Sequence, residues 1–149
     1  MYEGDVEIKS MEKLCLLKVR FCENVNLLSA IVKKSPNLKW LDIHFSPKRI
    51  DSTMLTNQFI GKFFIDTLEN LQNLRYLGMS NCNLLGSISC EYLNMMQIRE
   101  LSFSNCEQLD EFLNGVDKLV TLEELCFFNC KDLDGTSIQL GNLSTLQKL

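Results

Sequence analysis

The segments IRELSFSNCEQL, residues 98–109, and LEELCFFNCKDL, residues 122–133, carry apolar side chains and a cysteine at matching places. Apolar residues occupy the first, fourth, sixth and twelfth positions, and a cysteine occupies the ninth. Alternation around the fourth and sixth positions is typical of a short β-strand with one buried face. Because the two segments begin 24 residues apart, they predict a repeated structural unit.

The same frame recurs along the 149 residues, of which 26 are leucine. Copies begin at residues 14, 38, 74, 98, 122 and 146, and the last is cut short at Leu149. Every step is 24 residues except the step from 38 to 74, which is 36. We therefore expect residues 1–13 to be the tail of a preceding repeat, and residues 14–149 to be repeats, the second enlarged by 12 residues.

Each repeat also needs a return segment with its own buried side chains. Apolar residues three places before most starts are expected to supply them, namely Met11, Leu71, Met95, Leu119 and Leu143. In the enlarged repeat, Ser52 or Thr53 is expected to cap a helix. That helix would pack one broad apolar face on its neighbours, or alternatively protrude to dock a partner. The face comprises Leu55, Phe59, Ile60, Phe63 and Phe64.

This frame resembles the leucine-rich repeat family, whose signature is LxxLxLxx(N/C)xxL. The resemblance implies an α/β repeat solenoid, a fragment of a horseshoe with a parallel sheet on the concave face and helical or irregular convex segments. It also implies a structural ladder of small residues that turn inward after each strand and bond loop backbone. The ladder residues are Cys22, Ser46, Cys82, Cys106 and Cys130.

Two stretches, residues 68–77 and 140–149, resemble the repeats of plant nucleotide-binding immune receptors. In that family the repeats sense a pathogen effector and hold a nucleotide switch off. An alternative is the substrate-recognition repeats of an F-box type ubiquitin-ligase adaptor, which residues 32–38 (VKKSPNL) resemble. Either resemblance implies a protein-interaction module with a role outside catalysis.

Composition narrows the classes of function. A net charge of −4, 46% hydrophobic residues and 23% charged residues are typical of a globular chain, and they argue against disorder or a nucleic-acid-binding arm. No apolar run approaches membrane-spanning length, and the charged N-terminus is unlike a signal peptide. Seven cysteines, an odd number within apolar patterns, predict free thiols and a cytoplasmic location.

The residue types that carry chemistry are sparse. No CxxC motif occurs and His44 is the only histidine, so we expect no metal site. We expect no cofactor either, since the seven glycines form no phosphate-binding loop. Adjacent carboxylates such as Glu123 and Glu124 would point to opposite faces of a strand, which makes them poor acid–base pairs. The sequence therefore predicts that the chain is not an enzyme.

The outward strand positions form the candidate partner site. Exposed aromatic residues beside cations are typical of protein-binding hot spots. Residues 1–62 hold ten Lys and Arg against seven Asp and Glu, which favours an acidic protein partner. Alternatively, Trp40 and Phe45 would pack beneath a neighbouring repeat. The predicted partner-binding residues are Phe21, Lys39, Trp40, His44, Phe45, Arg75, Tyr76 and Arg99.

Overall fold

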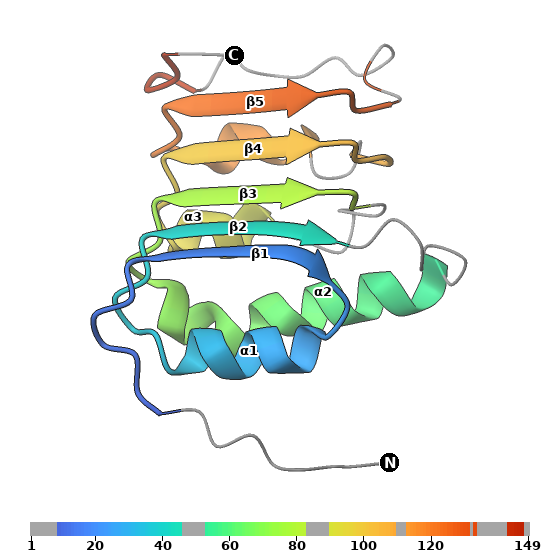
Figure 1. The fold of residues 1–149 in the computed structure, drawn as a ribbon. Coiled ribbons are helices and arrows are strands. Elements are labelled where there is room, and N and C mark those ends of the chain that lie inside the picture. Colours follow the sequence, from blue (N-terminus) through green and yellow to red (C-terminus); the bar gives the residue numbers. More distant parts are fainter. Residues whose placement is uncertain are drawn as a thin grey trace.

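The computed structural model describes residues 9–45, 53–82, 90–109, 113–131, 133 and 143–147. Its centre is a five-stranded sheet whose strands are all parallel and lie side by side in chain order (Figure 1). The predicted α/β arrangement with a parallel sheet is therefore confirmed. The strands are β1 (Leu16–Cys22), β2 (Trp40–Phe45), β3 (Tyr76–Ser80), β4 (Glu100–Ser104) and β5 (Glu124–Phe128).

The strands pair so that equivalent sequence positions lie beside one another. Leu41 pairs with Leu17 on one side and with Leu77 on the other, and Leu101 pairs with Leu77 and Leu125. A one-residue slip would turn each row of leucines from the core face to the opposite face of the sheet. The spacing of leucines in the sequence therefore specifies the strand register.

Helical segments connect the strands on one side of the sheet (Figure 1). The Asn24 side chain caps the first helix by accepting a hydrogen bond from the Leu27 amide at 2.9 Å. Such a cap satisfies an amide that the helix itself leaves without a partner. The described helical segments are α1 (Val25–Lys33), α2 (Thr53–Thr67), the 3-10 turn η2 (Leu68–Leu71), α3 (Cys90–Met95) and the 3-10 turn η4 (Val116–Lys118).

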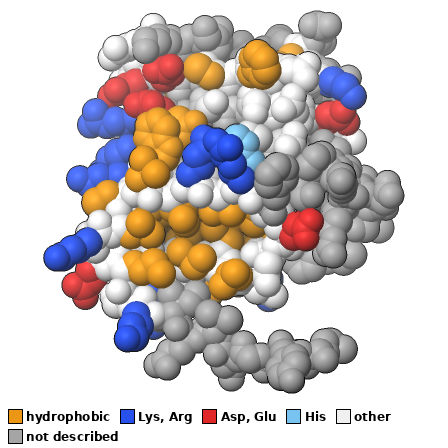
Figure 2. Space-filling view, in the orientation of Figure 1, with side chains coloured by type: hydrophobic (Ala, Val, Ile, Leu, Met, Phe, Trp, Pro, Cys, Tyr) orange, Lys and Arg blue, Asp and Glu red, His pale blue; other side chains and the backbone are white. Residues whose placement is uncertain are grey.

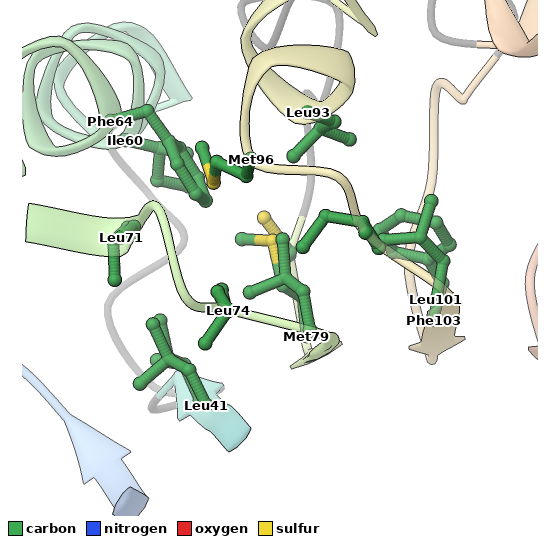
Figure 3. Packing of buried hydrophobic residues seen from close by; sticks show 14 of the residues in the cluster. Leu41, Ile60, Phe64, Leu71, Leu74, Met79, Leu93, Met96, Leu101 and Phe103 are labelled. Carbon is green, nitrogen blue, oxygen red and sulfur yellow. The ribbon is translucent and has the colours of Figure 1, made fainter. Parts of the chain in front are cut away.

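The hydrophobic core fills the space between this side of the sheet and the helical segments. Leu41, Leu101 and Phe103 reach it from the strands, and Phe64 and Leu93 reach it from the helices (Figure 3). Each is buried, and burying a side chain of this size stabilises the fold by about 1.5–3 kcal/mol. The strand residues that form the core alternate with those of the opposite face, as the pleat requires.

The 12 additional residues in the step from residue 38 to residue 74 fall in and around α2, which has 15 residues. Ile60, Phe63 and Phe64 are buried, so this part of the predicted apolar face packs on the core. The side chains of Leu55 and Phe59 and the residue Ser52 lie outside the described residues. The described part of α2 therefore agrees with the packed helix rather than with a wholly protruding one.

One predicted core position is wrong by a single residue. Met95 is 57% exposed, whereas Met96 is fully buried. The reason is local, because α3 ends at Met95 and Gln97 then adopts a left-handed backbone conformation with φ of 56°. This conformation is a common way to end a helix, and it turns Met96 instead of Met95 toward the core.

Candidate functional site: the open face of the sheet

The sheet has one face without described helical segments, which we call the open face (Figure 1). Its side chains form rows that cross the strands in register. The Trp40 row consists of Leu16, Trp40, Tyr76, Glu100 and Glu124. The Asp42 row consists of Lys18, Asp42, Gly78, Ser102 and Cys126. Figure 2 shows hydrophobic, basic, acidic and histidine side chains gathered over these strands.

An aromatic pair dominates the Trp40 row. The rings of Trp40 and Tyr76 stack with centroids 3.5 Å apart and an angle of 8° between their planes. Trp40 keeps 36% of its surface exposed, although a buried core lies directly beneath the sheet. Stacking on a neighbouring ring restricts the orientation of the indole on this face.

Gly78 makes room for this pair. A Cβ atom at residue 78 would lie 2.7 Å from the Tyr76 hydroxyl oxygen and 2.6 Å from Oδ1 of Asp42. Both distances are too short for real atoms, so any side chain here would displace the tyrosine or the carboxylate. A glycine in the middle of a strand has a conformational cost. At this position it allows the tyrosine side chain to approach the backbone closely.

Asp42 anchors a group of charged side chains beside the aromatic pair. Its Oδ2 accepts from Lys18 Nζ at 2.8 Å and lies 3.2 Å from His44 Nε2. Burial of the carboxyl group opposes ionisation, but the hydrogen bonds and charges of Lys18 and His44 outweigh it. The pKa of Asp42 is therefore lowered. The cluster fixes Lys18 and His44 on the face.

The neighbouring hydroxyl groups are also engaged. Burial raises the pKa of the Tyr76 hydroxyl, and the charges of Asp42 and Glu100 raise it further, although a hydrogen bond with Ser102 opposes them. The hydroxyl oxygens of Ser80 and Ser104 lie 2.7 Å apart on neighbouring strands. At neutral pH the face therefore presents a neutral tyrosine held by its surroundings.

Two of the three predicted cations beside the aromatic pair have structural partners of their own. Arg75 Nη1 donates to the carbonyl oxygens of Leu74 at 3.0 Å and of Gln72 and Met96 at 3.3 Å. Arg99 Nη1 lies 3.0 Å from Glu123 Oε1. Lys39 is exposed at the point where the chain enters β2. The structure thus brings Trp40 and Tyr76 together, places His44 further along the same face beside Asp42, and places the three cations at the strand entrances.

The predicted exposure of Phe45 is wrong. Phe45 is 7% exposed and belongs to the core. In the three following strands, an asparagine with positive φ ends the strand: Asn81, Asn105 or Asn129. Phenylalanine avoids that conformation, whereas asparagine tolerates it. The chain therefore stays extended through Phe45, and strand alternation turns its ring inward. The Phe21 side chain lies outside the part of the structure that is described.

The predicted ladder cysteines lie at the ends of the strands or just after them. Cys22, Cys82 and Cys106 are buried, and Cys130 is half-buried. Cys106 Sγ donates to the carbonyl oxygens of Ser104 at 3.4 Å and Met79 at 3.6 Å, and Cys130 Sγ donates to that of Phe103 at 3.5 Å. Burial raises the pKa of Cys106 to about 12. None of the seven cysteines forms a disulfide. Ser46 lies outside the described residues.

Sequence reasoning missed the Lys18–Asp42–His44 cluster, the role of Gly78 and the turns at the asparagines. The signal for the cluster was the alignment of the repeats, because Lys18 and Asp42 occupy the same position 24 residues apart. Opposite charges on directly facing strand positions attract. The signal for the turns was asparagine itself at one fixed position in three repeats.

Within the described residues, no three side chains among His, Cys, Asp and Glu are grouped so as to hold a metal ion. No helix in the same residues is long and apolar enough to cross a membrane.

Comparisons of the chain with protein-family models, with curated proteins and with solved structures find no match.

Proposed function

We propose that this chain is a non-enzymatic protein-interaction module whose open face binds a protein partner. The observation that carries the proposal is the stacked Trp40–Tyr76 pair, held over Gly78 on the face that the helical segments leave uncovered. Tryptophan and tyrosine are enriched among the few residues that supply most of an interface's binding energy. A rigid pair supplies a large contact area at a low cost in entropy.

The proposal includes a leucine-rich-repeat solenoid as the scaffold. In its support, the same hydrogen bond recurs from one strand entrance to the next, at 2.7–2.9 Å. Stacked repeats that contact only their neighbours would produce such a recurrence. In each case the amide of one repeat donates to the carbonyl oxygen of the repeat before it. The pairs are Lys39 to Cys15, Arg75 to Lys39, Arg99 to Arg75, Glu123 to Arg99, and Gln147 to Glu123.

We further propose that the module works in the cytoplasm as the sensing region of an immune-type receptor. The support for this finer assignment is the sequence resemblance carried by residues 68–77 and 140–149. Buried thiols that form no disulfide agree with a reducing compartment. In this role the open face would distinguish one protein from another by shape and charge. No residue of the face would need to act in catalysis.

A capture experiment with matched variants tests the proposed binding face. The chain, its Trp40→Ala variant and an Ile65→Ala control are each incubated with cytosolic extract, and bound proteins are quantified by mass spectrometry. Ile65 is 59% exposed on α2, away from the open face. Specific partners should be retained by the control and lost by Trp40→Ala. Equal retention of every partner by both variants would contradict the proposal.

A further inference from the structure

We propose that the open face recognises a partner segment that presents an arginine or lysine side chain to Tyr76 and Glu100. This inference rests on the proposed function and specifies the chemistry of the partner. The sequence predicts an acidic partner from the excess of Lys and Arg in residues 1–62, whereas this inference requires a partner with a positive charge at the site.

The aromatic pair supplies a surface that attracts cations. The face of an indole or phenol ring carries negative charge density, so an ammonium or guanidinium group near it is stabilised. Trp40 retains 36% of its surface exposed beside Tyr76. No lysine or arginine in the described part of the chain stacks on either ring. The position suits a cation that comes from another molecule.

The next strands extend the Trp40 row with carboxylates. Glu100 pairs in register with Tyr76, and Glu124 pairs in register with Glu100. Adjacent strands are about 4.8 Å apart, so one cationic side chain can reach the Tyr76 ring and the Glu100 carboxylate together. Like charges on facing strand positions repel each other. A partner cation beside Glu100 and Glu124 would reduce that repulsion.

Three of the cations at or beside the face are already engaged with the chain itself, while Lys39 is exposed. Lys18 pairs with Asp42 and Arg99 pairs with Glu123, while Arg75 donates to three backbone carbonyl groups. An acidic partner would have to break or share these contacts. Among the described residues, by contrast, no ion pair involves Glu100. Charge complementarity at the aromatic pair therefore favours a cationic segment.

The test selects peptides from a random dodecapeptide library displayed on phage, with the immobilised chain as the target. The recovered pool should be enriched in Arg and Lys and depleted in Asp and Glu relative to the starting library. Synthetic peptides from that pool are then titrated into the chain while the emission of Trp40, the only tryptophan, is recorded. The emission should change on binding.

Paired charge variants separate recognition at the site from general attraction to an acidic protein. Glu100→Gln with Glu124→Gln should weaken the selected peptides by about tenfold, as expected when a charged hydrogen-bond partner is lost. Glu69→Gln with Glu91→Gln removes the same charge from exposed positions on η2 and α3 and should leave binding unchanged.

The outcomes distinguish this inference from the proposed function. Peptides that change Trp40 emission but are acidic, or that bind the Glu100→Gln and Glu124→Gln chain equally well, would overturn the cationic partner and leave the binding face standing. Peptides that bind Trp40→Ala as tightly as the original chain, and leave Trp40 emission unchanged, would overturn both.

Discussion

Gly78 is the residue whose replacement tests the packing of the aromatic pair. Gly78→Ala would place a methyl group within 2.7 Å of the Tyr76 hydroxyl oxygen, so we expect the free energy of unfolding to fall by about 1–3 kcal/mol, as for other overpacked sites. Urea denaturation measures this change, and Trp40 emission should shift with it. In a Tyr76→Ala background the cost should become smaller. An additive cost would show that the ring does not occupy this space.

Asp42 should make the stability of the folded chain depend on pH. Its pKa is lower in the folded chain than in an unfolded chain, where the pKa of an aspartate is about 3.9. The stabilisation by its ionised form is therefore complete above that pH and is lost as the pH falls through the folded-state pKa. Thermal unfolding of the chain and of Asp42→Asn should differ most at neutral pH and converge in acid. A difference that stays constant into acid would contradict this assignment.

At the scale of single elements, Leu101 reports on the strand register. It lies in the centre of β4 and is buried between Leu77 and Leu125. Leu101→Ala should lower the free energy of unfolding by about 2–5 kcal/mol, because the fold can close only part of the resulting cavity. Leu16→Ala is the matched control, since Leu16 is 58% exposed on the open face and should change stability by less than about 0.5 kcal/mol. Equal effects would contradict the register.

The elements also show how far the sequence could predict the fold and the site. The strands were predictable because their register follows from leucines and cysteines that recur every 24 residues. The ends of elements were harder, because they depend on one residue with positive φ. The turn at Gln97 places Met96 instead of Met95 in the core. Residue 45 is phenylalanine where the later strands have asparagine, so β2 stays extended through this residue. Trp40 and Tyr76 were predicted on the open face, but their stacking depends on Gly78 in the neighbouring row.

At the scale of the whole molecule, one side of the sheet packs on the core and the other carries the proposed binding site. The helical segments and the core rows occupy one side, so large changes there should unfold the chain. The open face carries an exposed tryptophan, a buried carboxylate that contacts Lys18 and His44, and two carboxylates in the Trp40 row, arranged in register by the same strands. Because Trp40 is exposed on this face, we expect Trp40→Ala to alter the proposed binding with little effect on the fold.

Quenching of Trp40 fluorescence by acrylamide tests the central claim most directly, because Trp40 is the only tryptophan and lies at the centre of the proposed site. The measurement compares the chain alone with the chain saturated by a partner that Trp40→Ala fails to retain. That partner is produced with its own tryptophans replaced by phenylalanine. We predict that saturation lowers the quenching constant, because the partner covers the exposed part of the indole. A quenching constant that is unchanged at saturation would contradict binding on the open face.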